Sequence, residues 1–203
     1  MSEVRKKPTI IFEDDHWLYV PRAIPDSDIV FDALMEQIRD KVAIYQVSSA
    51  YAEGKTYDSH RLSCVFSDDG KSKYDGGVPP YKWEESSIMC AIKSYIERLL
   101  GVRFDYALCH LYRDGKDHIG AHRDKEGMKS IIASVSLGAT RKFRMRKMSR
   151  KNGWDEEFNL ESGSMIVMKA SCQHHYLHWV PEQKRIMEPR INLTFRQEEN
   201  RSS

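Results

Sequence analysis

Residues 110–126 read HLYRDGKDHIGAHRDKE, and the rest of the chain is organised around this segment. It places His122 and Asp124 two residues apart, so both side chains point the same way if the segment is extended. A neutral imidazole and a carboxylate that converge in this way can supply two of the three ligands of a 2-His-1-carboxylate iron site. The pair alone is a weak signal, because a His-x-Asp triplet often arises by chance in a chain of this length. The third ligand must come from elsewhere in the sequence.

The composition predicts one globular domain. The chain has 203 residues, of which 40% are hydrophobic, and this is enough to bury a single core. Its four cysteines form no C-x-x-C pair and no zinc spacing, which favours reduced thiols inside a cell. The N-terminus lacks the apolar core of a signal peptide, and no apolar run is long enough to span a membrane. We therefore expect an intracellular chain with no membrane partner.

Two amphipathic helices are predicted ahead of a β-rich part. Apolar residues recur at helical spacing over 28–42, where Asp26 or Ser27 can cap the helix. A second helix is expected after a cap at Ser86 or Ser87. Both apolar stripes are typical of core packing, so we expect these helices to support the fold and not to carry chemistry.

Between and after these helices the pattern changes. Residues 44–81 lack clear periodicity but are rich in aromatic and basic residues, which argues against disorder and favours a recognition lid with a few short strands. From residue 104 the periodicity becomes two. Strands are predicted at 104–112, 131–137, 142–147, 158–160, 164–168, 175–180 and 190–196. Seven short strands in so few residues indicate a sandwich or a jelly roll.

The last of these strands reads RINLTFR and alternates without interruption. One face carries Arg190, Asn192 and Arg196, and paired guanidinium groups of this kind are suited to bind a small dicarboxylate. The alternative is an exposed strand face with ordinary surface arginines. His178, twelve residues earlier, is the candidate for the third metal ligand, although a single His in an apolar strand is more often a core residue.

A basic tract lies between the two motifs. Residues 141–151 contain seven basic residues and no acid, a density expected of a surface that follows phosphates. We therefore expect Arg141, Arg144, Arg146 and Lys147 to contact a nucleic-acid backbone. The alternative is a solvated strand and turn. The net charge of +2 says little by itself.

Taken together, these motifs resemble the AlkB-type Fe(II)- and 2-oxoglutarate-dependent dioxygenases that repair alkylated bases, with the homologue-two branch the most similar. The resemblance is carried by the segments LYRDG at 111–115, HIGAHRD at 118–124, IIASVSLGA at 131–139 and EPRINLTFR at 188–196. It implies a double-stranded β-helix (jelly roll), mainly β with flanking α, with two N-terminal helices and a nucleotide-recognition lid. In that arrangement residues 1–100 form the helices and lid, and residues 101–203 form the catalytic core.

The resemblance also implies roles for individual residues. The implied iron ligands are His122, Asp124 and His178, and the implied 2-oxoglutarate residues are Tyr112, Arg190, Asn192 and Arg196. The implied substrate residues are Glu126, which matches an acidic position that recognises the damaged base, Tyr74, which would stack on that base, and Arg61. His110 stands where the family usually has Asn. The resemblance therefore leaves open whether this position contacts 2-oxoglutarate, although an imidazole N–H could replace the amide N–H of Asn.

The implied activity is oxidative demethylation of 1-methyladenine and 3-methylcytosine in DNA, using Fe(II), O2 and 2-oxoglutarate and releasing succinate, CO2 and formaldehyde. The partner would be alkylated duplex or single-stranded DNA, possibly RNA, and the protein would act as a monomer in the nucleus of a eukaryote or otherwise in the cytoplasm. Two other readings stay open. One is a dioxygenase of the same fold that acts on RNA, a protein side chain or a small molecule, and the other is a non-catalytic nucleic-acid-binding module.

Overall fold

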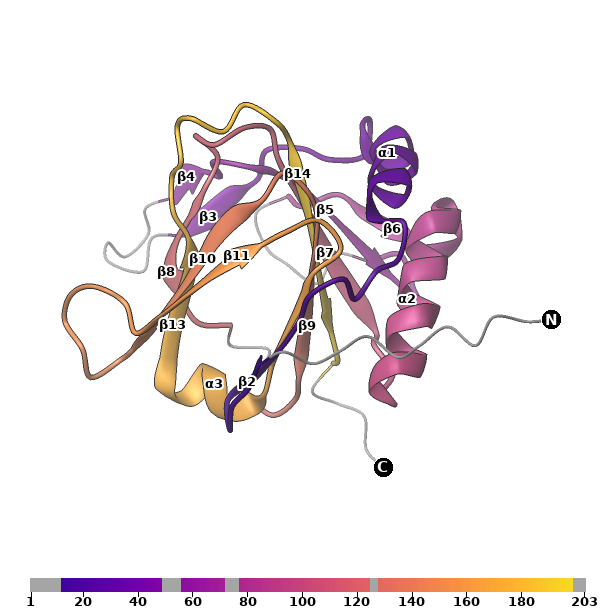
Figure 1. Cartoon of the computed structure of the whole chain (residues 1–203). Coiled ribbons are helices and arrows are strands. Elements are labelled where there is room, and N and C mark those ends of the chain that lie inside the picture. The colour runs from indigo at the N-terminus through magenta and orange to yellow at the C-terminus, as the bar shows by residue number, and fades with distance from the viewer. Residues whose placement is uncertain (1–11, 49–55, 72–76, 125–127, 199–203) are drawn as a thin grey trace.

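The computed structural model describes residues 12–48, 56–71, 77–124 and 128–198. Two β-sheets face each other, and helices cover the outer face of the larger sheet (Figure 1). This mainly β, jelly-roll arrangement is the fold class that the sequence predicted. No helix in the described part of the chain is long and apolar enough to cross a membrane.

The larger sheet has eight strands. In spatial order they are β1 (Phe12–Glu13), β2 (Trp17–Val20), β12 (Met165–Met168), β9 (Ile132–Gly138), β14 (Arg190–Arg196), β7 (Tyr106–Tyr112), β5 (Leu62–Ser67) and β6 (Pro80–Lys82). Only β5 and β6 pair in parallel among the described strands. The long central strands therefore come from the last half of the chain, and the edges come from its first half.

The smaller sheet has four strands and lies on the other side of the pocket described below. Its order is β11 (Glu156–Leu160), β10 (Arg141–Lys147), β13 (Tyr176–Val180) and β8 (Ile119–His122). A separate hairpin is formed by β3 (Gln46–Ser48) and β4 (Thr56–Asp58). The helical elements are α1 (Ser27–Ile38), the 3-10 turn η1 (Trp83–Glu85), α2 (Ser87–Leu100) and α3 (Ala170–His175).

Helix α2 begins and ends where its sequence signals predict. The Ser86 side chain accepts a hydrogen bond from the backbone N–H of Met89, and Gly101 closes the helix with φ 70°, a left-handed conformation that costs glycine little. Helix α1 ends at Ile38, four residues earlier than predicted. Both helices pack on the larger sheet, which confirms the expected support from two N-terminal helices (Figure 1).

Strand β14 divides the interior into two parts. Its apolar residues Ile191, Leu193 and Phe195 face the helices and join the main hydrophobic core. Its polar residues face the smaller sheet, and they are buried as well. A strand buried on both faces is not a surface strand, so the exposed alternative considered for this sequence is excluded.

Three parts of the fold differ from the prediction. The short strands expected within 44–81 exist, but β5 and β6 belong to the eight-stranded sheet and not to a lid. The short strand β8 was not among the predicted strands, and α3 was not among the predicted helices.

Candidate metal centre and co-substrate pocket

The candidate pocket lies between the two sheets. One wall is formed by the paired strands β14 and β7, in which Arg190 lies opposite Tyr112 and Asn192 lies opposite His110. The remaining lining residues come from β8, β9, β10, β12 and β13 and from the loop after β8: Ile119, His122, Asp124, Ser134, Phe143, Met168, His178 and Val180, with Thr194 and Arg196 of β14. The register of the strands therefore brings the predicted residues into one place.

The three predicted metal ligands form the centre of this pocket. His122 and His178 lie opposite each other on β8 and β13, and Asp124 follows two residues after His122. The Asp124 carboxylate is 3.6 Å from Nε2 of His122 and 3.5 Å from Nε2 of His178. One ligand atom from each residue lies within 4.8 Å of the others, close to the separation of atoms that share one ion at about 2 Å. This donor set, two imidazoles and a carboxylate, fits Fe(II) with open positions.

The tautomer of His122 suits a metal ligand. Its Nδ1 donates to the carbonyl oxygen of Gly120 at 2.8 Å, which leaves the lone pair of Nε2 directed at the centre. Burial and the neighbouring His178 lower the pKa of His122 to about 4. The imidazole is therefore neutral at physiological pH, as metal binding requires.

Asp124 is held in its charged form. Burial alone would raise the pKa of this carboxyl, but the guanidinium of Arg196 at 2.9 Å and the nearby His178 hold it well below its usual range. Both Asp124 and Arg196 are buried. Because an ion pair out of water is weakly screened, Arg196 fixes both the charge and the orientation of this ligand.

Arg190 lies at the opposite end of β14 from Arg196, and some of its hydrogen-bond donors have no partner among the described residues. Its Nη2 donates to the hydroxyl of Ser136 at 2.8 Å, while Nε and Nη1 are buried and have no partner among the described residues. Burial lowers the pKa of Arg190 to about 10, so the group remains charged at neutral pH. A buried cation with unused N–H groups fits a carboxylate. The pocket thus suits 2-oxoglutarate, with the metal ligands at one end and Arg190 at the other.

Asn192 has a different role in this structure. Its amide nitrogen donates to the hydroxyl of Ser134 at 2.9 Å and to the carbonyl of Val135 at 2.8 Å. Both amide hydrogens are thus used within the sheet, where they tie β14 to β9. A donor contact from Asn192 to 2-oxoglutarate would require breaking one of these bonds. Of these two predicted co-substrate residues, Arg190 rather than Asn192 has N–H groups without a partner among the described residues.

His110 is buried in the wall of the pocket in a neutral form. Its Nδ1 is 2.6 Å from the hydroxyl of Ser63 on the neighbouring strand. Burial, together with the charges of Arg61 and Arg196, lowers its pKa well below the ordinary value. A neutral imidazole keeps one N–H, so His110 can still donate as the amide of Asn does in the resembling family.

We expect His110 to make the fold acid-sensitive. The folded protein keeps His110 neutral, while the unfolded chain takes up a proton below about pH 6.5, so the free energy of unfolding decreases as the pH falls below that value. In His110→Asn this dependence should be weaker by up to about 1.4 kcal/mol per pH unit. Urea unfolding between pH 7 and pH 5 measures it. Equal pH dependence of the free energy of unfolding in the two proteins would contradict the neutral, buried state of His110. A 2-oxoglutarate titration on His110→Asn tests whether His110 makes the contact that Asn makes in the family.

The predicted substrate residues are only partly described. Glu126 and Tyr74 lie outside the described residues. Arg61 is buried and donates to the phenol oxygen of Tyr45 at 2.7 Å. Its guanidinium lies 6.0 Å from the centre of the Tyr112 ring, and Arg61 is not among the residues that line the pocket.

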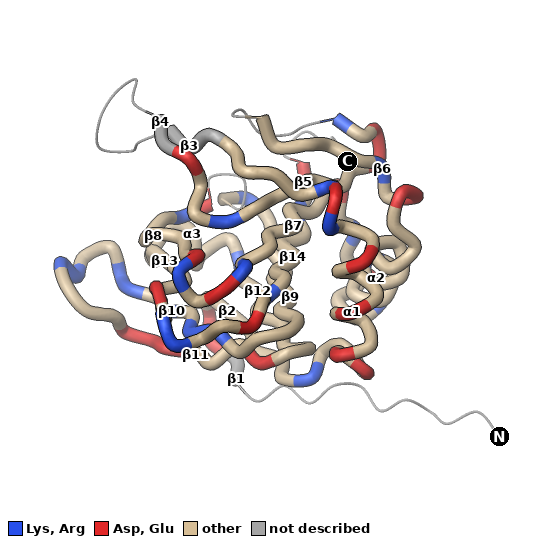
Figure 2. Tube along the Cα trace, turned by 90° about the horizontal axis from the view of Figure 1, so that it is seen from above, with Lys and Arg blue, Asp and Glu red and all other residues tan. Residues whose placement is uncertain are grey.

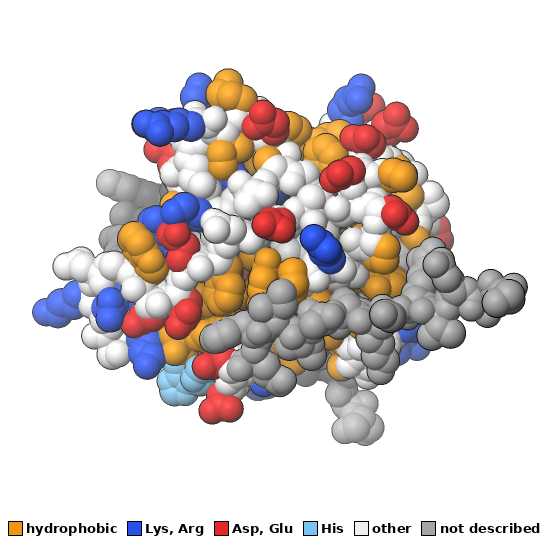
Figure 3. Space-filling model, viewed as in Figure 1, with side chains coloured by type: hydrophobic (Ala, Val, Ile, Leu, Met, Phe, Trp, Pro, Cys, Tyr) orange, Lys and Arg blue, Asp and Glu red, His pale blue; other side chains and the backbone are white. Residues whose placement is uncertain are grey.

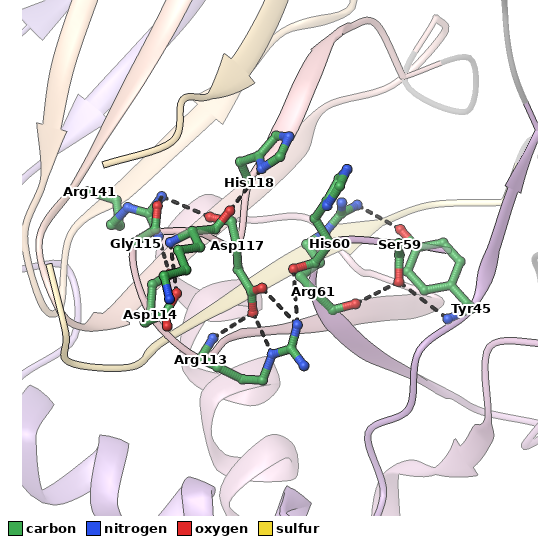
Figure 4. A network of polar contacts seen from close by, with 11 residues as sticks. Tyr45, Ser59, His60, Arg61, Arg113, Asp114, Gly115, Asp117, His118 and Arg141 are labelled. Atoms are coloured by element: carbon green, nitrogen blue, oxygen red, sulfur yellow. Dashed lines mark hydrogen bonds and ion pairs between the residues drawn. The ribbon is translucent and has the colours of Figure 1, made fainter. Parts of the chain in front are cut away.

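The prediction for Arg141 is wrong, because this residue is buried and does not face solvent. It is 1% exposed, and its guanidinium donates to the backbone carbonyls of Asp114 at 3.0 Å and Asp117 at 2.9 Å (Figure 4). It also donates to the backbone carbonyl of Pro181 at 2.9 Å. A further bond reaches the side chain of Gln183. Arg141 therefore joins two loops of the protein and cannot contact a phosphate.

Replacing Arg141 with lysine should destabilise the fold. An ammonium group cannot reach these carbonyls together, so buried acceptors would lose their partners and the free energy of unfolding should fall by about 3 kcal/mol. The matched control is Lys142→Arg, the next residue, whose exposed side chain should change stability by less than about 0.5 kcal/mol. Chemical denaturation measures both. A stable Arg141→Lys protein with weakened oligonucleotide binding would instead restore the phosphate role.

The remaining basic residues of the tract are partly neutralised. Glu157 on β11 accepts from Lys142 at 2.7 Å and from Arg144 at 2.6 Å, and the Arg144 guanidinium also lies 3.7 Å from the centre of the Trp154 ring. Acidic residues follow basic ones around the β10–β11 hairpin (Figure 2), and both signs are interspersed on its surface (Figure 3). The tract is therefore a mixed surface, not the continuous basic one expected. Among the described residues Lys147 forms no ion pair, and it remains a predicted phosphate contact together with Arg146.

Phe143 and Gln173 are among the residues of the site that sequence reasoning missed. Phe143 lines the pocket, with its ring centre 5.6 Å from that of His178. Gln173 is fully buried and accepts a hydrogen bond from the backbone N–H of Asp124. Phe143 could be found from the alternation of β10, because it faces inward between basic residues. Nothing in the local sequence marks Gln173.

Comparisons with known proteins agree with this geometry. Residues 19–196 match the family model described as "2OG-Fe(II) oxygenase superfamily". The chain is 31% identical over 178 residues to human "DNA oxidative demethylase ALKBH2", covering 81% of this chain and 67% of the relative. It is 40% identical over 179 residues to human "Alpha-ketoglutarate-dependent dioxygenase alkB homolog 3", covering 81% and 60%.

The fold agrees as well. A solved structure described as "The structure of OsALKBH1" superposes with a TM-score of 0.60 at 16% identity, covering 93% of this chain and all of the other. The chain spans 63% of the length of ALKBH2 from Bos taurus. The family model covers most of the chain, and the pocket holds the donor set and the open guanidinium that Fe(II) and 2-oxoglutarate require. The chain therefore belongs to the 2OG-Fe(II) oxygenase superfamily and, within it, to the AlkB-type dioxygenases.

Proposed function

We propose that this dioxygenase removes N-methyl groups from 1-methyladenine and 3-methylcytosine in DNA and releases succinate, CO2 and formaldehyde. The observation that carries the proposal is the assembled pocket in a chain 31% identical to a relative named as a DNA oxidative demethylase. With DNA as substrate, the protein would act in the nucleus of a eukaryote or otherwise in the cytoplasm, and we expect it to act as a monomer.

The chain's own residues have distinct tasks in this reaction. His122, Asp124 and His178 would hold Fe(II), and Arg190 would hold the 2-oxoglutarate carboxylate farther from the metal ligands. When bound, Fe(II), 2-oxoglutarate and O2 supply the oxidation that hydroxylates the methyl group, and the hydroxymethyl product then loses formaldehyde. The apolar walls Phe143 and Val180 help to keep water from the centre.

Unequal exposure of the metal ligands indicates where the base would enter. The side chain of His122 is 33% exposed, whereas those of His178 and Asp124 are 5% and 9% exposed. The centre is therefore approached from the side of His122. A base inside a duplex cannot reach this depth, so it would have to be flipped out of the stack. The two lesions suit this step, because their methyl groups block normal pairing and lower the cost of extrusion.

The experiment that tests the proposal measures succinate and formaldehyde on matched oligonucleotides. We expect both products with either lesion in single- or double-stranded DNA, and neither with the unmethylated sequence or with the His122→Ala protein. The same lesions in RNA test the alternative nucleic acid. Succinate release without demethylation of any oligonucleotide would contradict the proposal and favour a protein side chain as substrate. Binding of methylated DNA without succinate release would favour a non-catalytic module.

A further inference from the structure

Gln173 is a buried polar side chain that is neither a predicted metal ligand nor a predicted co-substrate residue. It lies in α3 and is fully buried. Its Oε1 accepts a hydrogen bond from the backbone N–H of Asp124 at 2.9 Å, and its Nε2 donates to the sulfur of Met168 at 3.6 Å. Burying an amide costs free energy unless its polar atoms are paired. The pairing of Gln173 is directed at a residue of the metal centre.

Asp124 depends on this contact because it lies beyond the strand ladder. Strand β8 ends at His122, where it pairs with His178 of β13. Asp124 itself belongs to no strand, yet it is buried. The amide oxygen of Gln173 takes the place of the partner strand that would otherwise satisfy the Asp124 N–H. An apolar side chain at residue 173 would leave that N–H buried without its partner.

The carboxylate end of Asp124 is fixed from a second direction. Arg196 lies 2.9 Å from its Oδ1, and the backbone end is fixed by Gln173. Because both its backbone N–H and its carboxylate are bound, Asp124 has little freedom to turn away from the two imidazoles. The orientation that brings three donors within 4.8 Å of one another therefore depends on Gln173 as well as on Arg196.

Helix α3 also connects two ligand-bearing segments. It ends at His175, directly before β13, so Gln173 lies five residues ahead of His178 in the chain. Through its side chain the same helix reaches Asp124, which is 49 residues away in sequence. One short helix thus sets the position of Asp124 relative to the strand that carries His178.

We propose that Gln173 is a positioning residue of the metal centre, which directs the Asp124 carboxylate by accepting the hydrogen bond of its backbone N–H. This role rests on the metal-ligand assignment and is independent of which nucleic acid or other molecule is oxidised. Loss of such a supporting contact typically weakens metal binding by about 10- to 100-fold.

The test uses Gln173→Met, which keeps the length and volume of the side chain and removes the acceptor. Mn(II), a redox-inert substitute for Fe(II), is titrated calorimetrically into the protein with 2-oxoglutarate present. We expect its affinity to fall by about 10- to 100-fold. Hydrogen exchange at the Asp124 amide should become at least about 10-fold faster, a change that a general loosening of the core would not confine to this amide. The matched control is Ser171→Ala on the same helix, whose hydroxyl instead bonds the carbonyl of Asp15, and it should change neither readout.

Mn(II) affinity within about twofold of the original, in a folded Gln173→Met protein, would overturn the proposal. If that variant does not fold, Gln173→Glu decides the question, because its carboxyl group keeps an acceptor oxygen at the same reach, although it replaces the donor to Met168 and adds a negative charge when ionised. Slow exchange of the Asp124 amide in Gln173→Glu supports the role, and fast exchange overturns it. Neither readout needs turnover, so failure of the proposed demethylation would leave this test unaffected.

Discussion

The His122→Ala protein is expected to lose tight Fe(II) binding and all turnover while it remains folded. Its affinity for Fe(II) should fall by more than about 100-fold, because a direct ligand contributes more than the outer contacts whose loss costs about 10- to 100-fold. His122 is the ligand best suited to this test because its side chain is partly exposed, so the cavity left by alanine is open to water. Anaerobic titration of the metal and single-turnover product measurements follow the two losses separately.

The matched control for His122→Ala is His118→Ala, four residues earlier on the same segment. His118 stacks on His60 with ring centres 4.1 Å apart and is not among the grouped metal donors. Its replacement should leave Fe(II) affinity unchanged. Full turnover by His122→Ala, or an equal loss of metal affinity in both variants, would show that the centre is elsewhere.

Strong periodicity explains why most of the fold could be predicted. Strand β14 was predicted with its observed bounds, because every second residue is apolar. Strand β8 has four residues and includes Gly120, so no alternation could mark it. Helix α3 has six residues, too few to show an apolar stripe. Short elements of this kind are fixed by their neighbours and not by their own sequence.

In the site, too, residues in a local pattern could be predicted, whereas roles that depend on tertiary contacts could not. His122 and Asp124 could be paired from their spacing, and strand pairing then brought His178 to them. The charge of Arg141 was equally visible, but the backbone carbonyls that surround it come from loops distant in sequence. Sequence composition shows where charge is, whereas burial and partners decide its role. Gln173 acts through a residue 49 positions away and could not be found without the fold.

The two arginines of β14 should respond differently to replacement by lysine. In Arg190→Lys the affinity for 2-oxoglutarate should fall by at least about 10-fold, because an ammonium cannot present the two N–H-bearing atoms, Nε and Nη1, that have no partner among the described residues. The affinity for Mn(II) should stay within about twofold, since Arg190 makes no contact with the metal ligands that the structure records. Calorimetric titration of each ligand, with the other present, separates the two effects.

Arg196→Lys is the internal comparison, because Arg196 is bound to Asp124 as well as lining the pocket. Here the affinities for 2-oxoglutarate and Mn(II) should both fall, since a lysine ammonium would hold the Asp124 carboxylate less firmly in its orientation. Equal 2-oxoglutarate affinity in Arg190→Lys and the original protein would show that Arg190 is structural, with its bond to Ser136 as its main role. Unchanged Mn(II) affinity in Arg196→Lys would show that Asp124 is oriented mainly from its backbone, which leaves Gln173 as the residue that directs it.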